Sequence, residues 1–193
     1  MSNNSIQVDL KDLYNKFDKF KKTLDDPSGV FTKTMSDMKS RAPGKVADAV
    51  RSQYSIKKAD VMPTKQKKEG SLKKAGTIKV KGETVETFNL YYEGRVLTPL
   101  HFGVTPKKLQ PHGKKYKVKL KVKKERRTVS SPTKEGQVPF VAPAKSGSST
   151  ILPWLREPDG TINPMKTVSL PQMVDNKVVR EDINTQLGEL LQT

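Results

Sequence analysis

The sequence predicts an α+β fold in which N-terminal amphipathic helices precede an antiparallel β-sheet and a C-terminal helix ends the chain. Two changes of pattern predict it. Apolar residues recur every three or four positions up to about residue 56 and again after Pro171, whereas they alternate at several places between residues 77 and 124. Because hydrophobic residues make up only 33% of the 193 positions, the core is expected to be thin, with room for partners to complete it.

The first helix is predicted over residues 7–24. Asp9 and Asp12 lie in its first turn and Lys21 and Lys22 in its last, which the helix dipole favours. A narrow apolar stripe with near-heptad spacing indicates that this helix packs against the core or against a neighbouring copy. The stripe consists of Leu10, Leu13, Phe17, Phe20 and Leu24.

After a break at Pro27, a second helix is predicted from near Val30 to Tyr54, and the pair Pro43-Gly44 is expected to interrupt it or to reset its start. A further short helical turn is expected before Pro63, followed by an exposed basic loop over residues 63–75. The apolar face of the second helix carries Phe31, Met35, Met38, Val46, Ala49 and Val50.

The middle of the chain is predicted to be β-structure. Residues 77–81 and 84–92 are expected to pair as a hairpin that turns at Gly82. Residues 95–104 are predicted to be extended, and Pro99 limits them to a sheet edge or a strand end. Residues 106–113 are predicted to form a loop.

Residues 115–124 have the clearest strand pattern in the chain. Lysines alternate with apolar residues, so one face of the strand is expected to join the core and the other to carry a row of ammonium groups. The apolar positions are Tyr116, Val118, Leu120 and Val122, and the row consists of Lys115, Lys117, Lys119, Lys121 and Lys123.

The C-terminal part is expected to begin with a loop over residues 130–148 that contains or flanks a short strand at the apolar patch 138–142. Residues 151–156 are predicted to be the final strand, which turns at Pro158. The last helix follows Pro171, and its apolar face consists of Val174, Val178, Val179, Ile183, Leu187, Leu190 and Leu191.

Three regions are therefore expected. Residues 1–62 form an N-terminal helical region, residues 63–167 form a basic antiparallel β region with long loops, and residues 168–193 form a C-terminal amphipathic helix that packs on the same domain.

Positive charge is concentrated in the middle of the chain. The net charge is +17, and residues 57–134 hold 22 basic residues against 6 acidic ones. Such a field attracts polyanions, such as nucleic acid, an anionic membrane or an acidic protein face. The alternative is a solvated surface that keeps the protein soluble. For the lysine row itself, protection of an exposed strand against edge-to-edge aggregation is favoured over phosphate contact, because the row carries no stacking aromatic residues. Candidate contacts are Lys115, Lys117, Lys119, Lys121, Lys123, Lys124, Arg126 and Arg127.

No pattern of residues indicates catalysis. The glycine-rich nucleotide motifs and the H-E-x-x-H zinc motif are absent, and the chain has no cysteine for a thiolate site. His101 and His112 have no carboxylate close by in the sequence, so surface or packing roles are expected for them rather than a metal site. The sequence therefore predicts that the protein is not an enzyme and needs no cofactor.

Membrane and export signals are also not expected. No apolar run approaches the ~20 residues that span a bilayer, and the first residues lack the basic and apolar regions of a signal peptide. The sequence predicts a soluble protein that is made inside the cell and has no membrane partner.

Several segments point to a family when they are taken together. Leu97-Thr-Pro-Leu-His-Phe leads to the lysine-rich strand, Val138-Pro-Phe-Val-Ala-Pro-Ala precedes Ile151-Leu-Pro-Trp-Leu-Arg, and Ser169-Leu-Pro-Gln-Met-Val precedes the last helix. Over roughly residues 40–193 this order resembles the minor tail protein Z family of tailed bacteriophages. The Ser169 segment is similar to the family's Pro-Ser-x-Pro-x-Met stretch, with Val168 in place of the first proline.

The resemblance implies a structural virion protein that completes the tail at its head-proximal end, or neck, and is assembled in the cytoplasm of the host bacterium. It implies a homo-oligomeric ring, with a hexamer favoured, that helps to join the tail to the head connector and lets DNA pass. Its partners would be the tail terminator, tail tube and connector proteins, together with the passing DNA. The resemblance supplies no catalytic residues.

Ring assembly would bury spare apolar surface between subunits. Trp154 is expected either in the core or as a subunit-contact anchor, because tryptophan is enriched in interface hot spots. The alternative function is a basic nucleic-acid-binding module that uses residues 57–134, and the two roles are compatible in a ring around DNA. The candidate subunit-interface residues are Leu13, Phe17, Phe20, Trp154, Val179, Ile183 and Leu187.

Overall fold

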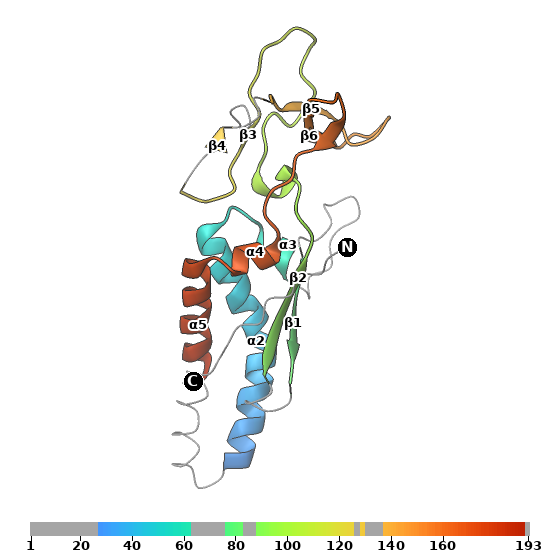
Figure 1. Ribbon diagram of the computed structural model, residues 1–193. Coiled ribbons are helices and arrows are strands. Elements are labelled where there is room, and N and C mark those ends of the chain that lie inside the picture. The colour runs from blue at the N-terminus through green and yellow to red at the C-terminus, as the bar shows by residue number, and fades with distance from the viewer. Residues whose placement is uncertain (1–26, 63–75, 83–87, 126–127, 130–136, 192–193) are drawn as a thin grey trace.

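The computed structural model describes residues 27–62, 76–82, 88–125, 128–129 and 137–191 (Figure 1). These residues form helices and antiparallel sheets, and the chain's last helix packs beside the first described one, so the predicted α+β class is confirmed. The predicted helix over residues 7–24 and the predicted basic loop over residues 63–75 lie outside the described residues.

Helix α2 (Pro27–Gln53) runs without a break through Pro43, so the predicted interruption at Pro43-Gly44 is wrong. A proline inside a helix removes one backbone hydrogen bond and crowds the preceding turn. Tertiary packing offsets that cost here, because Ala42, Val46 and Ala47 are completely buried on either side of the proline. The expected short turn follows as α3 (Lys58–Val61).

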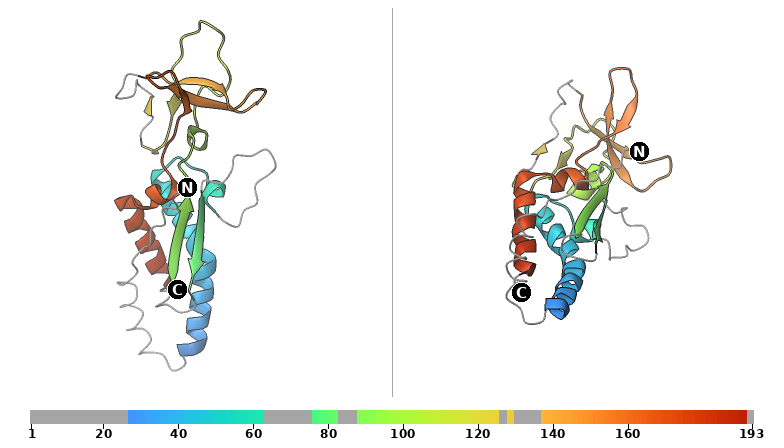
Figure 2. Two further views of the ribbon diagram at one scale, coloured as in Figure 1. Left: turned by 45° about the vertical axis from the view of Figure 1, so that its right-hand side comes forward. Right: turned by 60° about the horizontal axis from the view of Figure 1, so that its bottom comes forward.

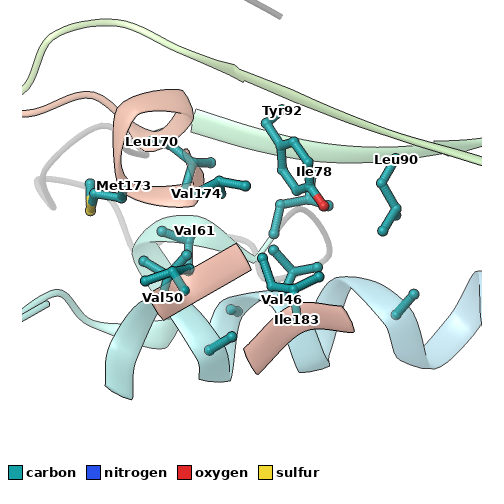
Figure 3. Close-up of a cluster of buried hydrophobic side chains, with 14 of the residues drawn as sticks. Val46, Val50, Val61, Ile78, Leu90, Tyr92, Leu170, Met173, Val174 and Ile183 are labelled. Atoms are coloured by element: carbon teal, nitrogen blue, oxygen red, sulfur yellow. The ribbon is translucent and has the colours of Figure 1, made fainter. Parts of the chain in front are cut away.

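The main core lies between α2, a β-hairpin and the C-terminal helices. Strands β1 (Gly76–Lys81) and β2 (Asn89–Gly94) form the predicted antiparallel hairpin. Helix α4 (Leu170–Val174) lies against β2, and α5 (Lys177–Leu191) lies along α2. Figure 3 shows apolar side chains from these elements pointing toward one another.

The predicted last helix is divided in two. Ser169 caps α4 by accepting a hydrogen bond from the Gln172 backbone N–H, α4 ends at Val174, and a new helix starts at Lys177. The break changes the helical phase, so Val178 is 51% exposed although the uninterrupted pattern placed it on the apolar face. The rest of that face is confirmed where its side chains are described, since Val174, Val179, Ile183 and Leu187 are buried and Leu190 is partly buried.

Tyr92 has a buried hydroxyl that finds no hydrogen-bond partner among the described residues. Burial raises the pKa of Tyr92 well above its ordinary value, so the phenol stays neutral. Because an unpaired buried hydroxyl is costly, Tyr92→Phe is expected to stabilise the fold by about 1 kcal/mol in urea denaturation.

Tyr54 supplies the control for this prediction, because the Asn176 side chain hydrogen-bonds its hydroxyl. Tyr54→Phe removes a bond that is made and is expected to lower stability by about 1 kcal/mol. A loss of stability in Tyr92→Phe as large as in Tyr54→Phe would show that the Tyr92 hydroxyl is paired.

Residues 95–168 form a second, smaller region at one end of the helical body (Figures 1 and 2). Here the expected extended segment is wrong, because Pro99–Phe102 forms a 3-10 helix, η1, with Pro99 at its start. Proline's fixed backbone angle suits the first turn of such a helix as well as it suits a strand edge. Strand β5 (Phe140–Pro143) lies at the apolar patch, as predicted, and pairs with β6 (Ile151–Arg156).

The sequence predicts that β6 is the final strand, and this prediction is wrong. The chain turns at Pro158 as predicted and returns as β7 (Ile162–Pro164), which pairs antiparallel with β6. The buried core of this second region is small. It consists of Val104, Val118, Leu120 and Val141, with partly buried residues packed around them.

Polar contacts tie the two regions together. The Thr167 backbone N–H donates to the Leu97 carbonyl at 2.7 Å, joining the two chain segments that connect the regions. Nearby, Nδ1 of His101 lies 3.3 Å from Oδ2 of Asp60, with both side chains buried. His101 is thus a packing histidine, as expected, but its carboxylate partner lies far away in the sequence.

Candidate functional site

The predicted lysine row lies in a segment that bridges the two regions. We call residues 107–124 the lysine segment; it contains nine lysines and no Asp or Glu. The predicted alternation of faces is confirmed, since Val118 and Leu120 are buried whereas Lys117 and Lys121 are exposed. The lysines of the segment are Lys107, Lys108, Lys114, Lys115, Lys117, Lys119, Lys121, Lys123 and Lys124.

The prediction of a continuous strand over residues 115–124 is wrong. Only β3 (Lys119–Leu120) is a strand, and it pairs with β4 (Thr128–Val129). The backbone N–H of Lys121 donates to Phe102 in η1 at 3.0 Å, and that of Lys124 donates to Gln53 at the end of α2 at 2.9 Å. Alternation decides which side chains are buried, but it does not decide which backbone groups the segment pairs with.

The lysines of this segment carry charges that the described part of the chain leaves unpaired. None of the nine forms an ion pair with a carboxylate among the described residues. Elsewhere lysines do find partners, such as Lys58 with Asp48 at 2.5 Å and Lys79 with Glu93 at 2.7 Å. An array of unpaired, exposed ammonium groups is a surface that attracts anions.

The sequence favours protection of a strand edge as the role of the row, but the described residues contain no long strand edge at these lysines. Strand β3 is two residues long, and the other β-pairings of residues 107–124 with described residues are isolated bridges, of Lys119 with Thr105 and of Lys123 with Tyr54. Edge protection is needed where a long flat strand presents unpaired backbone groups. The geometry therefore favours an anion-contacting role for the lysines.

The expected subunit-interface residues fall into three groups. The side chains of Val179, Ile183 and Leu187 are completely buried in the chain's own core, so they leave no free apolar surface there for a neighbouring subunit. Trp154 is half-buried, and its Nε1–H donates to the Ala142 carbonyl at 3.2 Å within the β5–β6 pair. The third group, Leu13, Phe17 and Phe20, lies outside the described residues, as do two of the candidate polyanion contacts, Arg126 and Arg127.

Exposed apolar side chains in the second region were missed by the sequence analysis. Val138 is 65% exposed, Leu109 52%, Val96 46% and Ile162 45%. Leu109 and Ile162 stand alone among polar neighbours, whereas Val138 begins the apolar patch 138–142 and Val96 precedes the buried Leu97, so no periodic signal distinguishes them as exposed. They lie in the same region as the small buried core.

Metal-ligating residues do not gather among the described residues, where no group of three or more His, Asp or Glu side chains could hold an ion. His112 is exposed in the loop that was predicted for residues 106–113. Within the same part of the chain, no helix combines the length and the apolar character that crossing a bilayer requires.

Comparison of the chain with protein-family models, with curated proteins and with solved structures finds no match.

Proposed function

We propose that the protein is a structural virion subunit of a tailed bacteriophage, located at the head-proximal end of the tail. Copies of it would form a ring, with a hexamer favoured, that helps to join the tail to the head connector and surrounds the passing DNA. The tail terminator, tail tube and connector proteins are its proposed neighbours. The sequence resemblance to the minor tail protein Z family supports this proposal for the segments after residue 40.

The observation that carries the proposal is the thin core of the second region. The separate core of residues 95–168 has four buried apolar side chains among the described residues, because Leu97 and Phe102 join the main core instead. Four large apolar side chains of the region remain exposed. Small regions with so little buried apolar surface are marginal on their own. Contact with neighbouring subunits would cover Leu109, Val138 and Ile162 and would complete the core.

Particle incorporation tests this role. Val138→Asp combined with Ile162→Asp places two charges on the exposed apolar surface without touching the main core. We expect the variant to fold and to be lost from purified phage particles, because burying a charge at a subunit contact is costly. Val178→Asp is the matched control, since Val178 is 51% exposed on the helical body, and it should be incorporated normally. Normal incorporation of the double variant would contradict the proposed contact surface.

A second function, nucleic-acid binding, is favoured by the lysine segment, whose lysines form no ion pair within the described part of the chain. This function is compatible with a ring around DNA. Contacts between lysines and phosphates release counterions, so log K should fall linearly with log salt concentration, with a slope of about −0.9 per phosphate contact. We expect duplex DNA binding by the full chain to show a slope of several units. DNA binding that is absent at low salt, or that does not change with salt, would contradict this function.

A further inference from the structure

A pocket lies where the lysine segment crosses the end of α2. Its volume is about 450 Å³, and it is lined by Ser55, Phe102, Gly103, Lys121, Lys124 and Glu125. Lys121 and Lys124 are candidate anion contacts on sequence grounds, but no sequence pattern groups them with the serine or the glycine. Three chain segments that are distant in sequence meet here.

Backbone hydrogen bonds hold the walls of the pocket in place. The Ser55 N–H donates to the Val122 carbonyl at 2.8 Å, and the N–H of Lys121 donates to the carbonyl of Phe102 at 3.0 Å. Phe102 is completely buried and anchors the η1 wall in the main core. The pocket is therefore built by the fold rather than by the positions of mobile side chains.

Gly103 keeps one side of the pocket open. It has a φ of +65°, the left-handed conformation that ends η1, and a Cβ placed on it would meet no atom within 4 Å. Lys121 and Lys124 are both exposed and have no carboxylate partner among the described residues, although Glu125 also lines the pocket. Two lysines and a serine that line an open space are suited to hold a phosphate, because lysine and serine are common donors to phosphate oxygens.

We propose that this pocket is the site at which one backbone phosphate of a nucleic acid is held, while the strand continues over the rest of the lysine segment. The inference rests on the polyanion contact proposed above and assigns a defined position within it. A long anionic ligand is favoured over an isolated anion because the two lysines of the pocket belong to a segment with seven further lysines and no Asp or Glu. Contact with phosphate alone makes the binding independent of base sequence.

The experiment measures binding of the full chain to a short fluorescent duplex DNA over a range of salt concentrations. Replacing both Lys121 and Lys124 with glutamine is expected to make the slope of log K against log salt less steep by about one, because the two lysines neutralise the single phosphate held in the pocket. Lys145→Gln with Lys166→Gln is the matched control, because it removes the same charge from exposed positions of the second region that lie outside both the pocket and the lysine segment. That control should leave the slope nearly unchanged.

Two further variants test the chemistry of the pocket. Ser55→Ala leaves the charge unchanged and is expected to weaken DNA binding about fivefold through loss of one hydrogen bond. Glu125→Gln removes the carboxylate from the pocket wall and is expected to tighten binding, because the ligand is an anion. Weaker binding by Glu125→Gln would overturn the assignment, as would equal losses in the pocket variant and its control.

Competing probes separate the remaining explanations. Polyglutamate that binds as tightly as DNA and depends on Lys121 and Lys124 would show that the site takes an acidic protein, which overturns the phosphate assignment. If the wild-type chain binds no DNA, the polyanion contact and the pocket both fail. Particle incorporation is a separate readout, since Val138 and Ile162 do not line the pocket, so the assembly role and this site can fail independently.

Discussion

Replacing Ile183 with alanine is expected to destabilise the protein by about 3 kcal/mol, enough to remove much of the stability of a typical domain. Ile183 lies at the middle of α5, is completely buried, and faces α2 across the main core (Figure 3). The truncation removes apolar burial and leaves a cavity that two packed helices cannot easily close. Urea denaturation followed by circular dichroism measures the loss.

Val178 provides the control for this change. It lies on the same helix, but its side chain is 51% exposed, so Val178→Ala is expected to change stability by less than about 0.5 kcal/mol. Equal effects of the two substitutions would mean that α5 does not present the described face to α2. The pair therefore tests the position of the break between α4 and α5.

Replacing Gly76 with alanine is expected to cost more than about 2 kcal/mol, because the added carbon overpacks a closed contact. A Cβ at Gly76 would lie 2.2 Å from the Glu93 carbonyl oxygen and 2.9 Å from Cδ2 of Leu170. Relief requires a shift of the β1–β2 backbone, since the nearer of the two atoms is main chain. The expected result is a lower midpoint in thermal or urea unfolding.

Gly44 gives the opposite expectation and serves as the control. It lies inside α2, and a Cβ there would meet nothing within 4 Å. Gly44→Ala is therefore expected to stabilise the protein by up to about 1 kcal/mol, the difference in helix propensity between the two residues. If Gly76→Ala were tolerated as well as Gly44→Ala, the close approach of the hairpin to α4 would be wrong.

The periodicity of apolar residues correctly predicted the helices and strands that bury one face. The helical period predicted α2 and α5, and the alternation of apolar and polar residues predicted the hairpin and the inward face of residues 116–122. Burial on one side produces these repeats of apolar residues in the sequence. Proline was the main source of error. Pro43 was expected to break a helix that packing keeps intact, and Pro99 was expected at a strand edge but starts η1.

Most of the candidate site could not be predicted from the sequence, because it is formed by tertiary contacts that leave no local sequence pattern. The lysines were visible from the sequence, but two features are consequences of the tertiary fold. These are the lack of carboxylate partners for the lysines among the described residues and the hydrogen bond from the Lys121 backbone N–H to the Phe102 carbonyl. Ser55 and Gly103 joined the site only because α2 ends beside η1. The pairing of His101 with Asp60 across 41 residues was hidden for the same reason.

The central claim, that the protein is a ring-forming assembly subunit, is tested most directly by mass-resolved light scattering of the purified chain. The measurement is made with and without duplex DNA, at low and moderate salt. A ring-forming subunit is expected to give a single closed oligomer that forms without DNA. Its mass should be several times the 21.6 kDa of one chain. A monomer at every concentration that gains mass only when DNA is added would contradict the assembly role and leave nucleic-acid binding as the function.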